Sequence, residues 1–322
     1  MPLIEAVPNL SEGRNLPLLH HLGRRLRQTP HVRLLGLDPN PCAHRTVFTL
    51  LGEPDALLEA LFDLFAQAVQ HLDMRVQHGA HPRLGAVDVC PLVPLQGVSL
   101  PQAAAYARAL GQRVGQELHI PVYLYEAAAT APERKNLAFL RRGEYENLAG
   151  KLQKLPPDFG PHTFTPSVQK TGATVIGARP ILIAFNINLN TTDVLPAQVI
   201  AARLRESNGG LKGVKAIGWY MENFRRAQVS CNITDFHAAP LARVFETCQR
   251  HAAQLGLQAT GCELVGLAPL QALLQAGRHY APAQRSPRAL LQAAANGLNL
   301  NEVKPFDPQE QILEIKAGLA AY

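Results

Sequence analysis

Two histidines three residues apart, His78 and His81, open the stretch "HGAHPRLGAVDVCPLVP". A neutral imidazole titrates near pH ~6.5, so it can both accept and return a proton at cellular pH. A positioned acid or base of this kind contributes ~100- to 10,000-fold in rate. The same residues could also bind a metal, or form a polar turn whose imidazoles bond to the backbone. The stretch alone leaves all three interpretations open.

A metal site would need further ligands, and Asp88 and Cys90 are the nearest candidates. Their spacing falls outside the usual zinc patterns, and Pro82 prevents both histidines from lying on one continuing helix face. Gly79 and Gly85 would let the backbone approach a small ligand closely. Acid–base catalysis is therefore favoured over metal binding, and we expect no metal.

Three further polar residues, Asn186, Asn188 and Asn190, alternate in "FNINLNTT". On a strand their side chains would point to the same side. That side is either a polar wall facing a ligand or the solvent-facing side of an antiparallel sheet.

The elements that must position these residues follow one pattern twice. Strand-like and helical periodicities alternate as β-α-β-β-α-β, the order of a ferredoxin-like split unit. The pattern predicts an α/β fold, an α+β sandwich, of two ferredoxin-like subdomains, 1–179 and 180–322, side by side with a ligand cleft between them. In the first half the strands are "LIEAVPN", "VRLLGLD", "RTVFTLLG" and "LGAVDVCPLVP", and the helices cover residues 16–28 and 54–72. In the second half the strands are "ILIAFNINL", "VKAIGWYM", "AQVSCNITDF" and "QATGCELVGLAP", and the helices cover 193–206 and 240–256.

Other segments join and follow these repeats. A helix in "PQAAAYARALGQRVGQELH" and a strand in "PVYLYE" precede residues 155–180, which are too rich in Pro, Gly and Thr for a helix. We expect a long loop there, and such loops are usually lids or linkers. After Pro269 three helical patterns follow, the last of them in "DPQEQILEIKAG".

The composition is that of a globular protein. The chain has 322 residues, 47% of them apolar, and its apolar runs are too short to span a membrane. Glu5 interrupts the N-terminal stretch where a secretory signal needs an apolar core. Five cysteines, scattered and without a CxxC pair, are typical of reduced thiols. We therefore expect a cytoplasmic protein without a membrane partner.

The formal net charge of +6 raises the question of an acidic partner. The arginines are dispersed in "GRRLRQ", "FLRRGEY" and "NFRRAQ", aromatic residues make up only 6%, and no RNA-binding aromatic signature is present. The charge therefore indicates a small anionic ligand or an ordinary solvated surface, and we expect no nucleic-acid partner.

Eight ordered motifs carry a resemblance to a known family. They are "VPNLSEGRN", "DPNPCAHRTVFTLLGEP", "HGAHPRLGAVDVCPLVP", "IPVYLYEAAA", "LRRGEYENL", "PDFGPHTFTPS", "GATVIGARPILIAFNINLNT" and "KAIGWY". From Leu3 to about Phe306 the chain resembles glutamate formimidoyltransferase, the transferase part of the bifunctional formiminotransferase–cyclodeaminase. The resemblance implies two α/β subdomains, a homodimer, and transfer of the formimidoyl group from N-formimidoyl-L-glutamate to N5 of tetrahydrofolate, the co-substrate. The products would be 5-formimidoyltetrahydrofolate and L-glutamate, in histidine degradation and one-carbon metabolism.

The functional residues of that family carry over onto matching positions. The catalytic histidine of its "HPR(L/M)GA" motif falls on His81, and its folate-contacting segment matches "GPHTFTPS" and a following glycine. In the family this serine and glycine are nearly adjacent, whereas "VQKT" separates them here. No room for a cyclodeaminase domain is left before Tyr322, so we expect transfer without cyclisation. The folate-binding positions are Gly160, Pro161, Phe164, Pro166, Ser167 and Gly172.

The reaction suits a single general acid and base. N5 of the folate would attack the amidine carbon, and His81 would remove a proton from N5 and deliver one to the glutamate nitrogen. No step needs a cysteine nucleophile. Both substrates are anions, and arginines are the natural anchors for carboxylates. The residues expected to bind carboxylates, to orient His81 or to hold the amidinium are Arg45, Arg83, Arg179, Asp38 and Asp88, each of which could instead be an ordinary surface or turn residue.

Three other functions fit the same residues. Formyl transfer from N-formylglutamate to tetrahydrofolate would use a donor that differs by one atom. A metal-dependent amidohydrolase would be built on His78 and His81. A non-catalytic folate-binding protein would bind folate without turnover.

Overall fold

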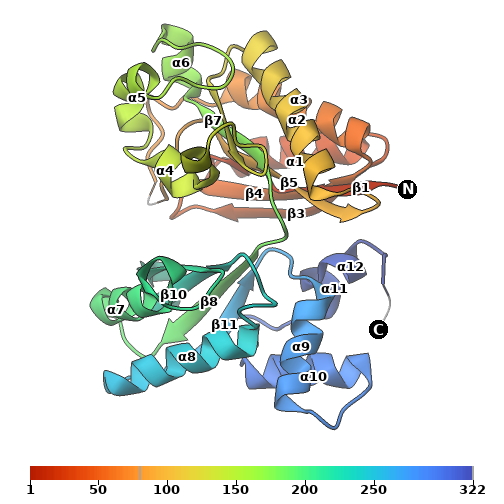
Figure 1. Cartoon of the computed structure of the whole chain (residues 1–322), viewed down its shortest axis with the longest axis vertical. Coiled ribbons are helices and arrows are strands. Elements are labelled where there is room, and N and C mark those ends of the chain that lie inside the picture. Colours follow the sequence, from red (N-terminus) through yellow and green to blue (C-terminus); the bar gives the residue numbers. More distant parts are fainter. Residues whose placement is uncertain (80, 321–322) are drawn as a thin grey trace. The chain divides into compact units, whose positions relative to one another are not determined.

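The computed structural model describes residues 1–79 and 81–320, and of Asn223 only the backbone. Contacts between Cα atoms divide the chain into two units, Met1–Pro180 and Ile181–Tyr322. Each unit builds a sheet from its own strands and covers it with helices (Figure 1). The expected mixed α/β fold with two sheets is therefore confirmed.

The first unit contains a seven-stranded sheet. Its order is β1-β4-β2-β5-β7-β6, with β3 added on β4. Strands β5, β7 and β6 run parallel, and the other pairs are antiparallel. The parallel strands β6 and β7 extend this unit beyond the six elements of the predicted repeat. The strands are β1 (Leu3–Ala6), β2 (Asn9–Leu10), β3 (Val32–Asn40), β4 (Arg45–Gly52), β5 (Val87–Gln96), β6 (Val122–Glu126) and β7 (Thr174–Ala178).

A proline explains the break between β1 and β2. The sequence predicts one strand from Leu3 to Asn9, but Pro8 has no N–H to donate to a neighbouring strand. Its carbonyl still accepts a hydrogen bond from the amide of Phe48, at 3.0 Å. Both short strands consequently pair with β4 on one side and with β5 on the other.

Three long helices pack on one face of this sheet: α1 (Leu16–Gln28), α2 (Pro54–His71) and α3 (Leu100–Glu117). Helix α1 begins where Asn15 accepts a hydrogen bond from the amide of Leu18. Helix α3 begins with a capping box formed by Ser99 and Gln102. The sequence predicted all three helices to within two residues at each end. No helix in residues 1–79 and 81–320 is both long enough and apolar enough to cross a membrane.

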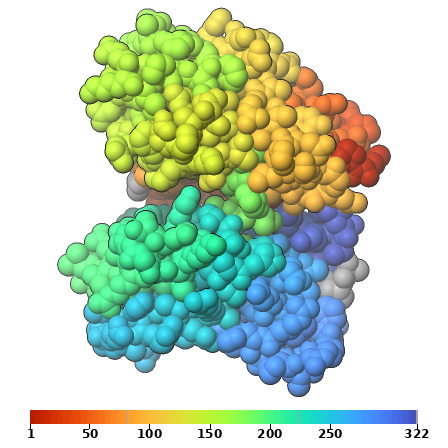
Figure 2. Space-filling model, viewed as in Figure 1, coloured from red at the N-terminus to blue at the C-terminus, as the bar shows by residue number. Residues whose placement is uncertain are grey.

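Shorter helices cover the opposite face over the parallel strands. Apolar side chains of all but the first of these helices join those of β5, β6 and β7 in a separate cluster. The space-filling view shows this segment as the yellow-green surface of the first unit (Figure 2). The helices are η1 (Pro132–Lys135), α4 (Leu137–Arg141), η2 (Tyr145–Asn147), α5 (Leu148–Lys154) and α6 (Pro166–Thr171).

The long loop expected over residues 155–180 is wrong in its second half, where α6 and β7 lie. All five residues of β7, "TVIGA", are buried, as in a central parallel strand. Such a strand lacks the polar alternation that marks a half-exposed strand in a sequence. The inserted "VQKT" completes α6, which ends at Thr171 and is followed by Gly172.

The second unit contains a four-stranded antiparallel sheet of order β11-β8-β10-β9. Helices α7 and α8 pack against it over an apolar core of their own. The elements follow one another as β-α-β-β-α-β, as the sequence predicted. The strands are β8 (Ile183–Leu189), β9 (Val214–Met221), β10 (Arg226–Ile233) and β11 (Ala259–Val265). The helices are α7 (Val194–Leu204), η3 (Glu206–Asn208), η4 (Glu222–Phe224), α8 (Leu241–Gln254), α9 (Leu270–Tyr280) and α10 (Pro287–Gly297).

The last helical pattern differs from the prediction. Instead of one helix over residues 307–318, the chain forms α11 (Pro308–Gln311) and α12 (Leu313–Lys316). Ile312 lies between them in an extended conformation and forms a β-bridge with Ala268. This pairing interrupts the helix that the local sequence favours.

Candidate active site

His81 lies in the loop that leads from α2 to β5, and its ring has two close neighbours. The Nδ1 atom is 2.7 Å from the carbonyl oxygen of Pro82 and 3.0 Å from Nη1 of Arg45. A carbonyl only accepts and a guanidinium only donates, so Nδ1 cannot hydrogen-bond to both at once. In the tautomer that carries its proton on Nδ1, this atom donates to Pro82 and Nε2 keeps the lone pair. Nε2 is then the atom that can take up a proton.

A buried carboxylate holds two arginines together beside this histidine. Asp88 accepts from Nη1 of Arg45 at 2.6 Å and from Nη2 of Arg141 at 2.5 Å, both at its Oδ2 atom. Its Oδ1 atom accepts from the amide of Leu84 at 2.9 Å. Arg45 is the first residue of β4 and Arg141 the last of α4. Two guanidinium groups share one carboxylate, so the cluster carries excess positive charge beside the imidazole.

A local irregularity of the sheet directs Asp88 toward these arginines. Asn9 lies opposite Val89 while Leu10 lies opposite Val87, so β5 has one extra residue, Asp88, at this point. A bulge of this kind changes the direction in which a side chain points. Asn9 also accepts a hydrogen bond from Nε of Arg45, at 2.8 Å. Strand β2 therefore positions both the carboxylate, through its irregular pairing with β5, and one of the arginines, through Asn9.

Burial and charge set the protonation states of the cluster. Burial, followed by the positive charges of Arg45 and Arg141, lowers the pKa of His81 to about 3, against the opposing charge of Asp88. Burial alone would raise the pKa of Asp88, but Arg141 and Arg45 outweigh it and hold that pKa below its usual range. Burial lowers the pKa of Arg45 to about 10. At neutral pH the site therefore holds a neutral imidazole, a carboxylate and two guanidinium ions.

The carried-over glycine at the end of α6 lies against the histidine loop. Gly172 has a φ of +67°, and a Cβ there would lie 2.3 Å from the carbonyl oxygen of Leu84 and 2.4 Å from Cα of Gly85. Backbone hydrogen bonds join the same segments, from Ala86 to the carbonyl of Thr171 at 2.8 Å and from Ala173 to that of Leu84 at 3.0 Å. Only glycine fits this approach.

The other carried-over folate positions lie along the segment before Gly172. Gly160 has a φ of +83° and packs against the carbonyl of Ile120, before β6. Phe164 is half-buried, with its ring centroid 6.1 Å from that of Tyr145. Pro161 is half-buried, Pro166 begins α6, and Ser167 is exposed on it. Folate contact at these positions stays a prediction.

Arg83 has a different environment from the one expected of a substrate anchor. It is 6% exposed, and its guanidinium makes five contacts within the chain, at 2.7 to 3.4 Å. These match the five N–H donors that a guanidinium has. The acceptors are Gln77, Glu144 and Glu146. The geometry favours a role in holding the histidine loop over a role in binding carboxylate.

Arg179 and Asp38 lie farther along the strands. Arg179 follows β7 and donates from Nη1 to the carbonyl of Pro180 at 3.0 Å. It also hydrogen-bonds Tyr125, whose pKa burial raises to about 12 although the charges of Arg179 and Arg141 oppose this rise. Asp38 is exposed on β3, in register with Val47 of β4. Their expected roles stay predictions.

The residues considered for metal or nucleophilic chemistry do not gather into a cluster. His78 is exposed. Within residues 1–79 and 81–320, no group of three His, Cys, Asp or Glu side chains is arranged to hold a metal ion. Cys90 is buried, and burial raises the pKa of its thiol, which makes it a poor nucleophile.

Two residues of the cluster, Asn9 and Arg141, escaped the sequence prediction. Both stand inside motifs that carried the family resemblance, "VPNLSEGRN" and "LRRGEYENL". That membership was a usable signal, but nothing in the spacing links residue 141 to residue 88.

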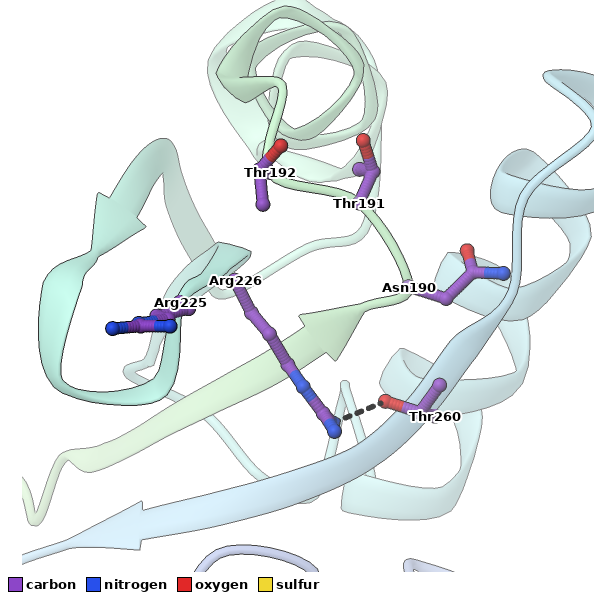
Figure 3. A pocket seen from close by; sticks show the side chains of 6 residues that line it. All are labelled: Asn190, Thr191, Thr192, Arg225, Arg226 and Thr260. Carbon is purple, nitrogen blue, oxygen red and sulfur yellow. Dashed lines mark hydrogen bonds between the residues drawn. The ribbon is translucent and has the colours of Figure 1, made fainter.

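The second unit has a polar cavity of about 550 Å³, lined by Asn190, Thr191, Thr192, Arg225, Arg226 and Thr260 (Figure 3). Arg226 crosses it to donate to Thr260 at 3.4 Å and also pairs with Glu302. The charge of Arg226 is therefore already balanced by Glu302.

The three alternating asparagines have different surroundings. Asn188 is fully buried, donates to Glu302 at 2.7 Å and accepts from Gln228 at 2.7 Å. Asn186 is 3% exposed and donates to Glu263 at 3.4 Å. The solvent-facing alternative is therefore wrong for these two residues, whereas Asn190 is exposed.

Comparison with known proteins adds a family relationship to this geometry. A model described as "Formiminotransferase domain, N-terminal subdomain" matches residues 3–179, and one described as "Formiminotransferase domain" matches residues 184–317. The formimidoyltransferase-cyclodeaminase of Mus musculus is 44% identical over 97% of this chain, which spans 59% of that protein's length. The glutamate formimidoyltransferase of Streptococcus pyogenes serotype M1 is 37% identical, over 97% of both chains. That of Thermoplasma acidophilum is 39% identical over 87% of this chain and 92% of its own.

Proposed function

Because the chain belongs to the formiminotransferase family, we propose that it transfers the formimidoyl group of N-formimidoyl-L-glutamate to N5 of tetrahydrofolate. The products are 5-formimidoyltetrahydrofolate and L-glutamate. The proposal is supported by relatives named glutamate formimidoyltransferase that match this chain over most of their length. A cytoplasmic homodimer is part of the proposal, and light scattering would measure its mass.

One observation carries the chemistry: a neutral imidazole, His81, is fixed at Nδ1 by the Pro82 carbonyl and flanked by a cationic cluster. Attack of N5 on the amidine carbon gives a tetrahedral adduct in which N5 is positively charged and acidic. Nε2 of His81 removes the proton from N5 and then delivers it to the glutamate nitrogen as the carbon–nitrogen bond breaks. One group can perform both transfers because the two nitrogens are attached to the same carbon.

The arginines serve the substrate's negative charges in this proposal. Glutamate carries two carboxylates and folate carries more, and guanidinium groups bind carboxylates through paired hydrogen bonds. Arg45 and Arg141 keep 11% and 15% of their side-chain surface exposed, so a carboxylate can reach them. Arg83 holds the loop instead, through Gln77 and the two glutamates.

The test is a reaction of the purified protein with N-formimidoyl-L-glutamate and tetrahydrofolate. We expect glutamate release that depends on the folate, together with the absorbance change of an N5-substituted folate. A parallel reaction with N-formylglutamate separates formyl from formimidoyl transfer. Glutamate release without tetrahydrofolate, abolished by a chelator, would indicate a metal-dependent amidohydrolase. Tight folate binding without release from either donor would indicate a binding protein.

A further inference from the structure

The cluster around Asp88 leaves hydrogen-bond donors unused. Arg45 donates from Nε to Asn9 and from Nη1 to Asp88, while Arg141 donates from Nε and Nη2 to Asp88. Within residues 1–79 and 81–320, no acceptor contacts Nη2 of Arg45 or Nη1 of Arg141. Both arginines bind the same oxygen of Asp88, so their guanidinium groups lie next to each other. The unused donors and the uncompensated charge are those of a site for one oxyanion.

We propose that Arg45 and Arg141 form the subsite for a carboxylate of the amidine-bearing amino acid, and that filling this subsite prepares the imidazole of His81 for proton transfer. The inference rests on the proposed function, which supplies the carboxylate. It makes Arg141 a binding residue and Asp88 a positioning residue that holds the two guanidinium groups together.

The charges around the imidazole explain why the carboxylate would act on it. His81 faces Arg45 from β4, Arg141 from α4 and Asp88 from β5, and Nδ1 contacts the Pro82 carbonyl. Burial and the arginines hold the pKa of His81 at about 3, which makes the neutral imidazole a weak base for the first proton transfer at neutral pH. A bound anion a few ångströms away offsets the arginines and raises such a pKa by about 1–3 units. The imidazole therefore becomes a usable acid and base only when the substrate is present.

This coupling also predicts how the enzyme would select its substrate. An amidine that lacks the carboxylate would leave the arginines uncompensated and His81 a weak base. Such a compound should therefore react with a lower kcat, as well as bind with a higher KM. Because binding and protonation are linked, carboxylate binding at pH 6 should draw protons from the buffer.

The experiment measures the protonation of His81 with a probe that cannot react. Protein labelled with ¹³C at histidine Cε1 is titrated from pH 2.5 to pH 8 alone, with saturating glutarate, and with glutaramide, which has the same skeleton without the charges. The His81 resonance is assigned by its loss in His81→Gln. We expect glutarate, and not glutaramide, to raise the pKa of His81 by at least about one unit.

Two matched variants distinguish the loss of the subsite from the loss of a positive charge close to it. Arg141→Gln should raise the pKa of His81 in the free protein and weaken glutarate binding by roughly tenfold or more. Arg142→Gln removes the same charge from the exposed neighbouring residue, and should leave both quantities within twofold. If Arg141→Gln does not fold, Arg141→Lys keeps the charge but loses the paired geometry. It should then keep the low pKa and still weaken glutarate binding.

The inference and the proposed function can fail separately. A His81 pKa that does not respond to saturating glutarate, or no glutarate binding up to its solubility limit with or without folate, would overturn the subsite even if formimidoyl transfer is observed. An anion-dependent pKa in a protein that releases no glutamate from either donor would keep the subsite and overturn the proposed reaction.

Discussion

A buried imidazole beside two guanidinium groups differs chemically from one in water, and at His81 burial and these charges together give a pKa near 3 instead of ~6.5. The side chain stays neutral throughout the range in which a folate-dependent transferase would work. Its value as a catalyst then depends on the contact at Nδ1, which fixes the ring, and on what occupies the space beside Arg45 and Arg141.

Removal of the imidazole tests its part in the reaction. His81→Ala should lower kcat by at least ~100-fold, because both proton transfers lose their carrier, and should leave the Kd of folate within a few-fold. Steady-state kinetics and a folate titration measure the two quantities. Near wild-type turnover in this variant would remove His81 from the mechanism.

The depressed pKa of His81 also predicts acid sensitivity. Below pH ~6.5 the unfolded chain binds a proton at this histidine, whereas the folded chain does so only near pH 3. The unfolded state binds more protons in this window, so stability falls as pH decreases through it. Between pH 7 and pH 5 the loss from His81 is at most about 2 kcal/mol.

Urea unfolding at the two pH values, in the wild type and in His81→Gln, isolates this contribution. The wild type should lose more free energy of unfolding than the variant. Asp88 does not interfere, because its own pKa is lowered and its stabilising effect is lost only below the unfolded value of ~3.9. Equal losses in the two proteins would show that His81 titrates normally.

At the scale of elements, the histidine loop is held by segments distant in sequence. Gly172, which follows α6, packs against this loop. Ser11, which follows β2, donates from its hydroxyl to the carbonyl of Gly85 at 2.7 Å. Glu146 of η2 accepts from Arg83 of the loop. These contacts fix the backbone on both sides of the loop's exit into β5. A change at the end of α6 should therefore affect the side chain of His81, although α6 does not contact it.

Two glycines in the first unit test this connection. Gly172→Ala places a Cβ 2.3 Å from a backbone oxygen at a φ of +67°, whereas Gly97→Ala, at a φ of +64°, meets nothing closer than 3.5 Å. Gly97→Ala should cost about 1–2 kcal/mol for the left-handed backbone alone. Gly172→Ala should cost about 1–3 kcal/mol more because of the clash. Urea unfolding measures both.

Catalysis gives a second readout of the same pair. Only Gly172→Ala should also lower kcat, since it displaces Leu84 and Gly85, which lie in the same loop as His81, the proposed acid and base. Equal stabilities and equal rates for the two variants would contradict the contact between α6 and the loop.

At the scale of the whole molecule, the chain is two units with separate cores. All strands of the seven-stranded sheet lie within residues 3–178 and all those of the four-stranded sheet within residues 183–265. The apolar clusters divide in the same way, with two in the first unit and one in the second. A unit with its own sheet and core can fold by itself.

Expression of residues 1–180 and 181–320 as separate fragments tests this independence. Each should show mixed α/β circular dichroism and a cooperative urea transition. If their stabilities differ, unfolding of the full chain should proceed in two steps. A fragment that melts without cooperativity and binds a hydrophobic dye would show that its core needs the other unit.

The sequence predicted the regular elements best where local signals were complete. Asn15 and a proline at the first turn mark the start of α1, for example. It failed at β7, whose buried strand has no alternation, and at Ile312, where pairing with Ala268 overrides a helical pattern. Both failures come from tertiary contacts that no short window contains.

The sequence by itself determined the long helices and most of the strands and, through its motifs, that His81 is the residue on which to base a mechanism. Only the tertiary structure decided what surrounds that histidine. Arg141 and Asp88 are 53 residues apart in the chain and meet because a bulge turns Asp88 and the packing of α4 brings Arg141 to it. Electrostatic energies depend on distances of a few ångströms between charges, and a sequence without its fold does not contain those distances.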